Sequence, residues 1–210
     1  MIKAIIFDWN GVIADSLKLD HQLFLKDVKS LKLTVPKSLE FYRDLFNSNM
    51  YENLLRIGFP KEMLIEDKNY KEVYMKNMNK TRIFLGMKAV LKILHKKYKI
   101  ALITSNYDIT VNTFNKKYGI DKFFDLILTA DTHKYKTEKV RMFLERFSLK
   151  KDEVIFIGDT LADIKVCKKS GLKIIAVTWG YHDKSRLKKA DPDFIANKPK
   201  DILTILNNLR

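Results

Sequence analysis

Short apolar runs alternate with longer amphipathic segments along most of this chain. The apolar runs are rich in β-branched residues and lie at 2–7, 100–104, 126–129, 154–158, 173–178 and, less distinctly, 193–195. They are too short for helices, and their composition is typical of strands that are buried on both faces of a sheet. We therefore expect six strands, the last of them at an edge of the sheet.

The segments between these runs carry apolar residues at helical spacing. Helices are predicted at 86–98, 109–118, 137–147, 162–170 and 201–209. Strands that alternate with helices form parallel sheets with helices on both faces. The predicted fold class is therefore α/β, with a Rossmann-like parallel sheet.

One stretch near the start of the chain departs from this alternation. Residues 17–81 show helical spacing throughout, with apolar positions at Leu19, Leu23, Phe24 and Val28 and again at Leu39, Tyr42, Phe46 and Met50. Pro36 and the run Gly58–Pro60 separate successive helices, the last of which is predicted at 61–78. We expect an α/β core of residues 1–15 and 82–210, with an all-helical module of residues 16–81 inserted after the first strand.

The composition, with 46% hydrophobic and 31% charged residues, is that of a chain able to bury a core. No window approaches the ~18 apolar residues of a membrane span, and the first apolar run is too short for a signal peptide. Cys167 is the single cysteine, and its place in a predicted helix favours a buried structural thiol. We therefore expect no membrane association and a cytoplasmic protein.

The net charge of +15 results from 40 Lys and Arg residues against 25 Asp and Glu residues. Such an excess favours anionic ligands. The lysines are dispersed, however, and no basic helix is interleaved with aromatic residues, so no specific nucleic-acid partner is expected. The four histidines and one cysteine show no zinc-site spacing. The expected partner is a small anionic molecule.

Polar side chains stand where several predicted strands end. Asp8 follows the first strand, the run Thr104–Asn106 follows the second, Lys134 and Lys136 follow the third, and Asp159 with Asp163 follows the fourth. The carboxyl ends of parallel strands meet at one edge of the sheet, where ligands bind. Two carboxylates there favour Mg²⁺, while a hydroxyl and an ammonium suit phosphoryl oxygens. The pattern predicts a phosphoryl-transfer site with Asp8 as nucleophile, and Gly11 lets the backbone approach a bound group closely.

Three runs carry a resemblance to a known family. FDWNGVIADS at 7–16, LITSN at 102–106 and IGDTLADI at 157–164, with a lysine before a helix between the last two, together resemble the haloacid dehalogenase superfamily of hydrolases. The chain looks most like the phosphoglycolate-phosphatase-like branch, which carries a helical cap after the first motif. The resemblance spans nearly the whole chain, and residues 16–81 lie where that branch keeps its cap.

The resemblance implies a Mg²⁺-dependent phosphatase acting on a small phosphorylated metabolite, of the phosphoglycolate kind. Asp8 matches the nucleophile that becomes an aspartyl-phosphate and that also binds Mg²⁺. Thr104 matches the hydroxyl that holds phosphoryl oxygens, Asp159 matches a Mg²⁺ ligand, and Asp163 matches a ligand that acts through a metal-bound water. We further expect substrate contacts from Gly11, Thr104, Ser105, Asn106 and Lys136.

Two lysines compete for the role of the family's third motif, because its usual Lys-Pro pair has no equivalent here. Lys136 stands immediately before the predicted helix, as the family's lysine does. An ungapped count back from Asp159 favours Lys134 instead. We prefer Lys136 and keep Lys134 as the alternative.

Asn10 is the clearest departure from the family, whose phosphatases carry there an aspartate that protonates the leaving group. Its backbone carbonyl is still able to bind Mg²⁺, but an amide cannot act as a carboxylic acid, a form of catalysis that contributes roughly 10²–10⁴-fold. Three hypotheses follow. The substrate has a good leaving group, as acyl phosphates do; or His21, Asp20 or Asp15 supplies the proton; or the chain is a catalytically weakened phosphate-binding or regulatory protein.

Other assignments are weaker. A phosphomutase would use the same nucleophile and cap, and a 2-haloacid dehalogenase is disfavoured because it needs no Mg²⁺ whereas Asp159 and Asp163 are present. Trp9 is expected to point away from its neighbours and pack in the core. The run Trp179–His182 follows the fifth strand and is able to line the rim of the site.

Overall fold

Six parallel strands form the centre of the computed structural model, which describes residues 1–66, 72, 75–77 and 80–209. They are β1 (Ala4–Phe7), β4 (Lys99–Ile103), β5 (Leu126–Leu128), β6 (Val154–Gly158), β7 (Lys173–Val177) and β8 (Phe194–Ala196). Within the described residues their order across the sheet is β5-β4-β1-β6-β7-β8, with Phe7 in register with Leu102 on one side and Ile157 on the other. The predicted Rossmann-like α/β fold is thus confirmed.

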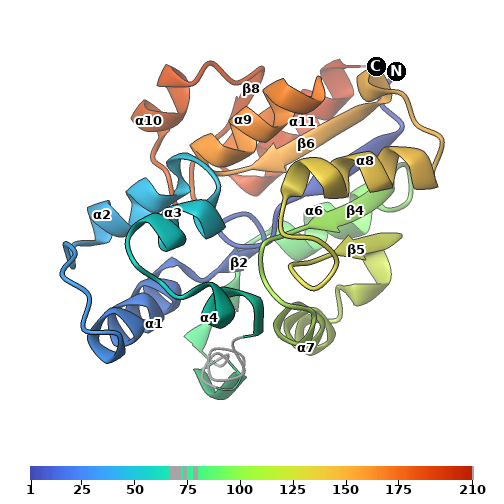
Figure 1. Ribbon diagram of the computed structural model, residues 1–210. Helices are drawn as coiled ribbons and strands as arrows, with labels where there is room; N and C mark the ends of the chain where they lie inside the picture. The colour runs from blue at the N-terminus through green and yellow to red at the C-terminus, as the bar shows by residue number, and fades with distance from the viewer. Residues whose placement is uncertain (67–71, 73–74, 78–79, 210) are drawn as a thin grey trace.

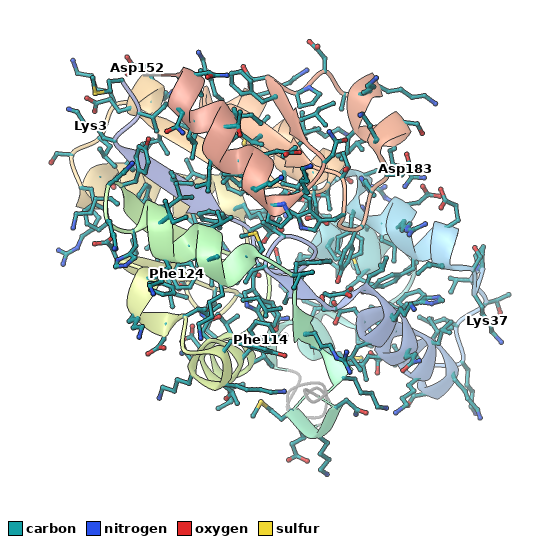
Figure 2. All side chains as sticks on the ribbon, turned by 180° about the vertical axis from the view of Figure 1, so that it is seen from behind. Lys3, Lys37, Phe114, Phe124, Asp152 and Asp183 are labelled. Carbon is teal, nitrogen blue, oxygen red and sulfur yellow. The ribbon has the colours of Figure 1, made fainter. Side chains whose placement is uncertain are left out.

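Helices cover both faces of this sheet, because successive strand residues point to opposite sides. Ile5 and Phe7 pack beneath α6 (Met87–Leu94), α7 (Asp108–Tyr118) and α11 (Pro199–Asn208). Ala4 and Ile6 pack beneath α8 (Lys136–Arg146), α9 (Leu161–Ser170) and α10 (Lys184–Lys189). Figure 1 shows α8 and α9 in front of the sheet, and Figure 2 views the opposite side, where Phe114 of α7 is labelled.

The second core also contains Cys167, which is fully buried among apolar side chains of α8, α9 and the sheet. This confirms the prediction of a structural thiol. Trp9 is likewise fully buried and packs edge-on against Phe114 at a ring distance of 5.1 Å, as the sequence predicts.

The stretch after the first strand is helical, as predicted, with α1 (Leu17–Ser30), α2 (Leu39–Asp44), a 3-10 turn (Leu45–Asn47), α3 (Met50–Arg56) and α4 (Lys61–Glu66). The apolar spacing from Leu39 to Met50 suggests one helix, and that interpretation is wrong. Ser48 is extended, and Asn49 caps α3 by accepting a hydrogen bond from the Glu52 amide, so a new helix begins there. Part of the helix predicted at 61–78 lies outside the described residues.

A short two-stranded ribbon connects this helical segment to the sheet. β2 (Ala14–Asp15) pairs antiparallel with β3 (Arg82–Ile83), so Asp15 lies opposite Arg82. Two residues are too few to show an alternating pattern, which is why the sequence does not predict either strand. The ribbon puts the start and the end of the helical segment side by side.

The remaining differences between prediction and structure concern short elements and the ends of helices. The helix predicted at 86–98 ends at Leu94, and α10 is not predicted. In the described part of the chain, 3-10 turns also lie at Asp121–Phe123 and Lys151–Glu153. In the described part of the chain, no helix combines the length and the apolar character that crossing a membrane requires.

Candidate active site

Three strand ends meet at the point where the order of strands in the sheet reverses. β1 lies between β4 and β6, and these three strands lead into Asp8, Thr104 and Asp159. Crevices at such reversal points are where open α/β sheets bind their ligands. The fold therefore brings together three of the residues that the sequence singles out.

A cluster of buried carboxylates occupies this edge of the sheet. Asp8, Asp159 and Asp163 each place one oxygen within 4.8 Å of the others. Burial, and then the neighbouring carboxylates, raise the pKa of Asp159 well above its usual value. Burial also raises the pKa of Asp8 to about 6, against the opposing effect of Lys136. Within the described residues, Asp159 Oδ1 is buried without a hydrogen-bond partner.

These observations fit a hard divalent cation. A buried carboxylate oxygen without a partner is costly, and Mg²⁺ is usually held by one or two carboxylates together with water and phosphate oxygens. The possible metal ligands here are the three carboxylates, and the backbone carbonyl of Asn10 lies close to Asp8 in sequence. The cluster is thus chemically suited to Mg²⁺.

Two glycines leave room for the Asp159 carboxylate. Gly11 has a φ of +75°, and a Cβ added to it would lie 1.9 Å from Asp159 Oδ2; at Gly180 the corresponding distance is 2.2 Å. Asp159 Oδ2 also accepts a hydrogen bond of 2.6 Å from the Tyr181 amide. Gly11 therefore lies against Asp159, and the cavity described below is lined by its neighbour Asn10. The predicted substrate contact of Gly11 stays a prediction.

Lys136 is the first residue of α8 and lies between two of the carboxylates. Its Nζ is 2.7 Å from Asp8 Oδ2 and 2.7 Å from Asp163 Oδ1. Burial lowers the pKa of Lys136, but Asp163 and Asp8 outweigh it and raise that pKa above its usual value. Lys134, the alternative, is exposed, and its Nζ lies 5.1 Å and 5.2 Å from the ring centres of Tyr51 and Tyr135.

Asp163 lies in the first turn of α9, the helix that follows β6. Its Oδ2 accepts hydrogen bonds from the backbone amides of Asp159 and Thr160, and the Thr160 hydroxyl in turn accepts from the Asp163 amide. This reciprocal capping of α9 fixes the Asp163 carboxylate, because both its backbone and its side chain are held. Its other oxygen, Oδ1, accepts a hydrogen bond from Lys136 Nζ.

The Thr104–Asn106 loop follows β4 and lines the same cavity. Thr104 is buried, and its hydroxyl accepts a hydrogen bond of 3.1 Å from the Asn106 amide. Asn106 is held by Thr110 and by the Tyr107 amide, and its Nδ2 reaches Asn10 Oδ1 over 3.4 Å. Ser105 is exposed toward solvent.

Asn10 connects this loop to the helical segment. Its Nδ2 donates to Ser16 Oγ and to Asp20 Oδ2, each over 2.8 Å, and the Tyr181 hydroxyl also donates to Asp20. Burial raises the pKa of Asp20 to about 6. Among the three proton donors considered from the sequence, Asp20 contacts Asn10. His21 instead lies 3.0 Å from the Lys37 carbonyl, and Asp15 is exposed in β2.

Tyr181, from the run Trp179–His182 that the sequence predicts at the rim, is buried and lines the cavity. Lys139 is a residue near the site that the sequence does not predict. Lys139 is fully buried three residues after Lys136 on α8, and its Nζ donates to the carbonyls of Thr104 and Thr129. Burial lowers the pKa of Lys139 to about 7. The spacing of three, which puts both lysines on one helix face, is the signal that would have revealed it.

His182 does not line the rim, contrary to the expectation from the sequence. The side chain of His182 is fully buried. Its Nδ1 accepts a hydrogen bond from the Leu161 amide, and its Nε2 lies 2.9 Å from the Arg43 carbonyl. The reason is that its ring lies between α9, through the Leu161 amide, and α2, through the Arg43 carbonyl. Tyr181 packs instead against the rings of Tyr42 and Phe46. His182 thus joins the core to the helical segment.

A cavity of about 920 Å³ opens between the strand ends and the helical segment. Its polar side is formed by Asp8, Asn10, Thr104, Ser105, Asn106 and Lys136. Its other side comes from α1, α2, α3 and α4 and from the turns between them. A phosphoryl group on the polar side would meet the Asp8 carboxylate, the Thr104 hydroxyl and the Lys136 ammonium.

Known proteins resemble this chain in both sequence and structure. The model of the haloacid dehalogenase-like hydrolase family matches residues 5–177. A phosphoglycolate phosphatase of Aquifex aeolicus is 26% identical over 99% of this chain and 98% of its own length. A pyrophosphatase PpaX of Bacillus velezensis is 32% identical over 51% of each chain. A haloacid dehalogenase-like family protein of Streptococcus pneumoniae superposes with a TM-score of 0.82 at 25% identity, over 98% of both chains.

Proposed function

The chain belongs to the haloacid dehalogenase-like hydrolase family, and on that premise we propose that it is a Mg²⁺-dependent phosphatase acting through an aspartyl-phosphate on Asp8. The observation that carries the proposal is the buried cluster of Asp8, Asp159 and Asp163 beside Lys136. The names of the relatives from Aquifex aeolicus and Bacillus velezensis support phosphate release as the reaction.

Asp8 is the proposed nucleophile. One of its carboxylate oxygens forms a bond to phosphorus, and the bond between phosphorus and the leaving oxygen breaks with its electron pair on that oxygen. That oxygen then takes up a proton from solvent. A water oxygen then attacks phosphorus, breaks the acyl-phosphate bond and leaves inorganic phosphate and a free Asp8 carboxylate. Lys136 and the Thr104 hydroxyl hold the phosphoryl oxygens during both steps.

Mg²⁺ would be held by Asp8, Asp159 and the Asn10 carbonyl. Asp163 would contribute through a metal-bound water. When bound, the ion offsets the charge of the carboxylates and of the phosphoryl oxygens. Lys136 is already paired with Asp8 and Asp163, so it stays charged and fixes the orientation of both carboxylates. Lys139 supports Thr104 from behind by bonding to its carbonyl.

We propose residues 16–81 as a cap that closes over the cavity and excludes water. Two observations support this role. Its helices have a hydrophobic cluster of their own around Phe24, Tyr42 and Phe59, and the chain enters and leaves the segment through the β2–β3 ribbon. Figure 1 shows these helices to one side of the sheet.

The test is phosphate release from a panel of small phosphorylated compounds, with Mg²⁺ and with EDTA. We expect release that requires Mg²⁺ and that is lost in Asp8→Asn. Beryllium fluoride, which mimics a phosphoryl group on a carboxylate, should protect the wild type but not Asp8→Asn from thermal unfolding. Protection without turnover would instead favour a phosphate-binding or regulatory protein, and absence of both would overturn the proposal.

A further inference from the structure

We infer that the leaving group of the substrate is uncharged and carries an aromatic or similarly bulky apolar group, an inference that rests on the proposed phosphatase activity. The relatives named above act, by their names, on phosphoglycolate and pyrophosphate, whose leaving groups are anions. The cavity wall on the side of the helical segment is built for different chemistry.

The first observation is the apolar character of this wall. It is lined by Phe24, Phe46, Met50, Leu54, Phe59, Met63 and Leu64. Phe46, Met50 and Leu54 are only half-buried, so part of each side chain faces the cavity. Tyr107 and Tyr135 add two rings from the α/β core. Sites that bind small molecules use such surfaces to bury apolar groups.

The second observation concerns charge. The described residues of the helical segment contribute three acidic side chains to the lining, Asp20, Asp27 and Glu52, and neither a lysine nor an arginine. A carboxylate or a second phosphate directed at this wall would meet like charges, and the described residues of the helical segment offer no cation on the lining to offset its lost hydration. An uncharged group loses little hydration there and gains contact with the apolar side chains.

The remaining lysines of the lining do not change this conclusion. Lys134, Lys165 and Lys169 come from the α/β core and are exposed, so they lie at the solvent edge of the lining. Lys134 is also held between the rings of Tyr51 and Tyr135. Lys136, the buried lysine, is committed to Asp8 and Asp163.

The volume points the same way. About 920 Å³ lies at the upper end of the range of small-molecule sites, roughly 300–1,000 Å³. A phosphoryl group beside Asp8 occupies a small part of that space. A flat ring attached to it fits in the remaining space, whose lining includes Phe46 and Met50, and aromatic and thioether groups give favourable contacts with such a ring.

The experiment uses two substrates that differ in one group. 4-Ethylphenyl phosphate and 4-(carboxymethyl)phenyl phosphate have similar size and leaving groups of similar acidity, but the second carries an extra negative charge. With Mg²⁺ present, we expect kcat/KM for the ethyl compound to exceed that for the carboxymethyl compound by at least about tenfold. The apolar wall buries an ethyl group but does not accommodate a carboxylate. Phosphoglycolate and pyrophosphate should be poorer substrates than either.

Matched variants on one helix test whether this wall is responsible. Met50→Lys places a cation in the lining, and Leu55→Lys makes the same change at an exposed position of α3 outside it. Met50→Lys should shift the preference by roughly fivefold toward the carboxymethyl substrate, whereas Leu55→Lys should leave the ratio unchanged. Equal ratios in both variants would contradict the assignment of the wall.

Binding separates this inference from the phosphatase proposal. The two matching phosphonates cannot be hydrolysed, and calorimetry with Mg²⁺ present measures their affinities without any turnover. Tighter binding of the ethyl compound supports the inference even if no phosphate is released. Absence of phosphate release would count against the proposed phosphatase activity and not against the inference. Equal binding, or preference for the carboxymethyl compound, overturns the inference while leaving the phosphatase proposal intact.

Discussion

The side-chain amide of Asn10 donates a hydrogen bond of 2.8 Å to the carboxylate of Asp20. This bond joins the residue two places beyond the proposed nucleophile to the first helix of the helical segment, and both side chains line the cavity. The site therefore holds a carboxyl group next to position 10 rather than at it. The consequence for acid catalysis is open to measurement.

Replacing Asn10 with aspartate should change how the rate depends on the leaving group. The introduced carboxyl group would lie as close to the Asp20 carboxyl as the Asn10 amide does now. Because two such groups repel when both are ionised, one of them would keep its proton near neutral pH. For substituted phenyl phosphates we expect N10D to speed release of poor leaving groups by about 10²-fold. Good leaving groups such as 2,4-dinitrophenolate should gain little.

The readout is the slope of log kcat against leaving-group pKa. It should be steep in the wild type and flatter in N10D. A flat slope in the wild type would show that another residue already donates the proton, and Asp20→Asn would then identify whether that residue is Asp20.

Asp20 should make stability depend on pH. Folding raises its pKa from 3.8 to about 6, so well below pH 3.8 it is protonated in both states and costs nothing. Above pH 6 it is ionised in both states, and the folded protein carries the full cost, at most about 3 kcal/mol. Asp20→Asn removes this titration, so its stability relative to wild type should rise between pH 4 and pH 6.

Urea unfolding of both proteins from pH 4 to pH 8 measures that difference. Other titrating groups are common to the two proteins and cancel in the comparison. A difference that does not change over this range would contradict the account of Asp20.

The two candidate lysines should respond differently to removal of their charge. Lys136→Met leaves Asp8 and Asp163 without their cation and takes an ammonium from the phosphoryl site, so kcat/KM should fall by about 10²–10³-fold. Lys134→Met removes an exposed charge that contacts two rings, and activity should change little. The reverse result would assign the role to Lys134.

Magnesium should stabilise the wild-type fold, because it offsets the charge of three buried carboxylates. A concentration about 100 times the dissociation constant should raise the melting temperature by about 5–10 °C. Asp159→Asn should lose most of this shift, since Asp159 Oδ1 has no hydrogen-bond partner within the described residues.

Differential scanning fluorimetry with increasing Mg²⁺ tests this, with EDTA as reference. Asp152→Asn, which neutralises an exposed carboxylate, is the matched control and should keep the full shift. An equal shift in Asp159→Asn would remove Asp159 from the metal site.

The sequence predicts the sheet well, since its strands are buried on both faces and stand out as apolar runs. Polar residues at the ends of those runs, such as Asp8 and Thr104, could be located for the same reason. The ribbon and α10 are too short to carry a periodic signal. Lys139 and Tyr181 belong to types that are usually exposed or half-exposed, and their burial depends on partners from distant segments. The contact between Asn10 and Asp20 depends on the entry angle of α1, which spacing alone does not give.

The pairing of Asp15 with Arg82 has a consequence for how such a chain diversifies. The inserted helices leave and rejoin the core at a single point, so a longer, shorter or unrelated insert with the same end spacing fits there without shifting the register of the six strands. Selectivity is then free to change by exchange of one module, while Asp8, Thr104 and Asp159 keep their places.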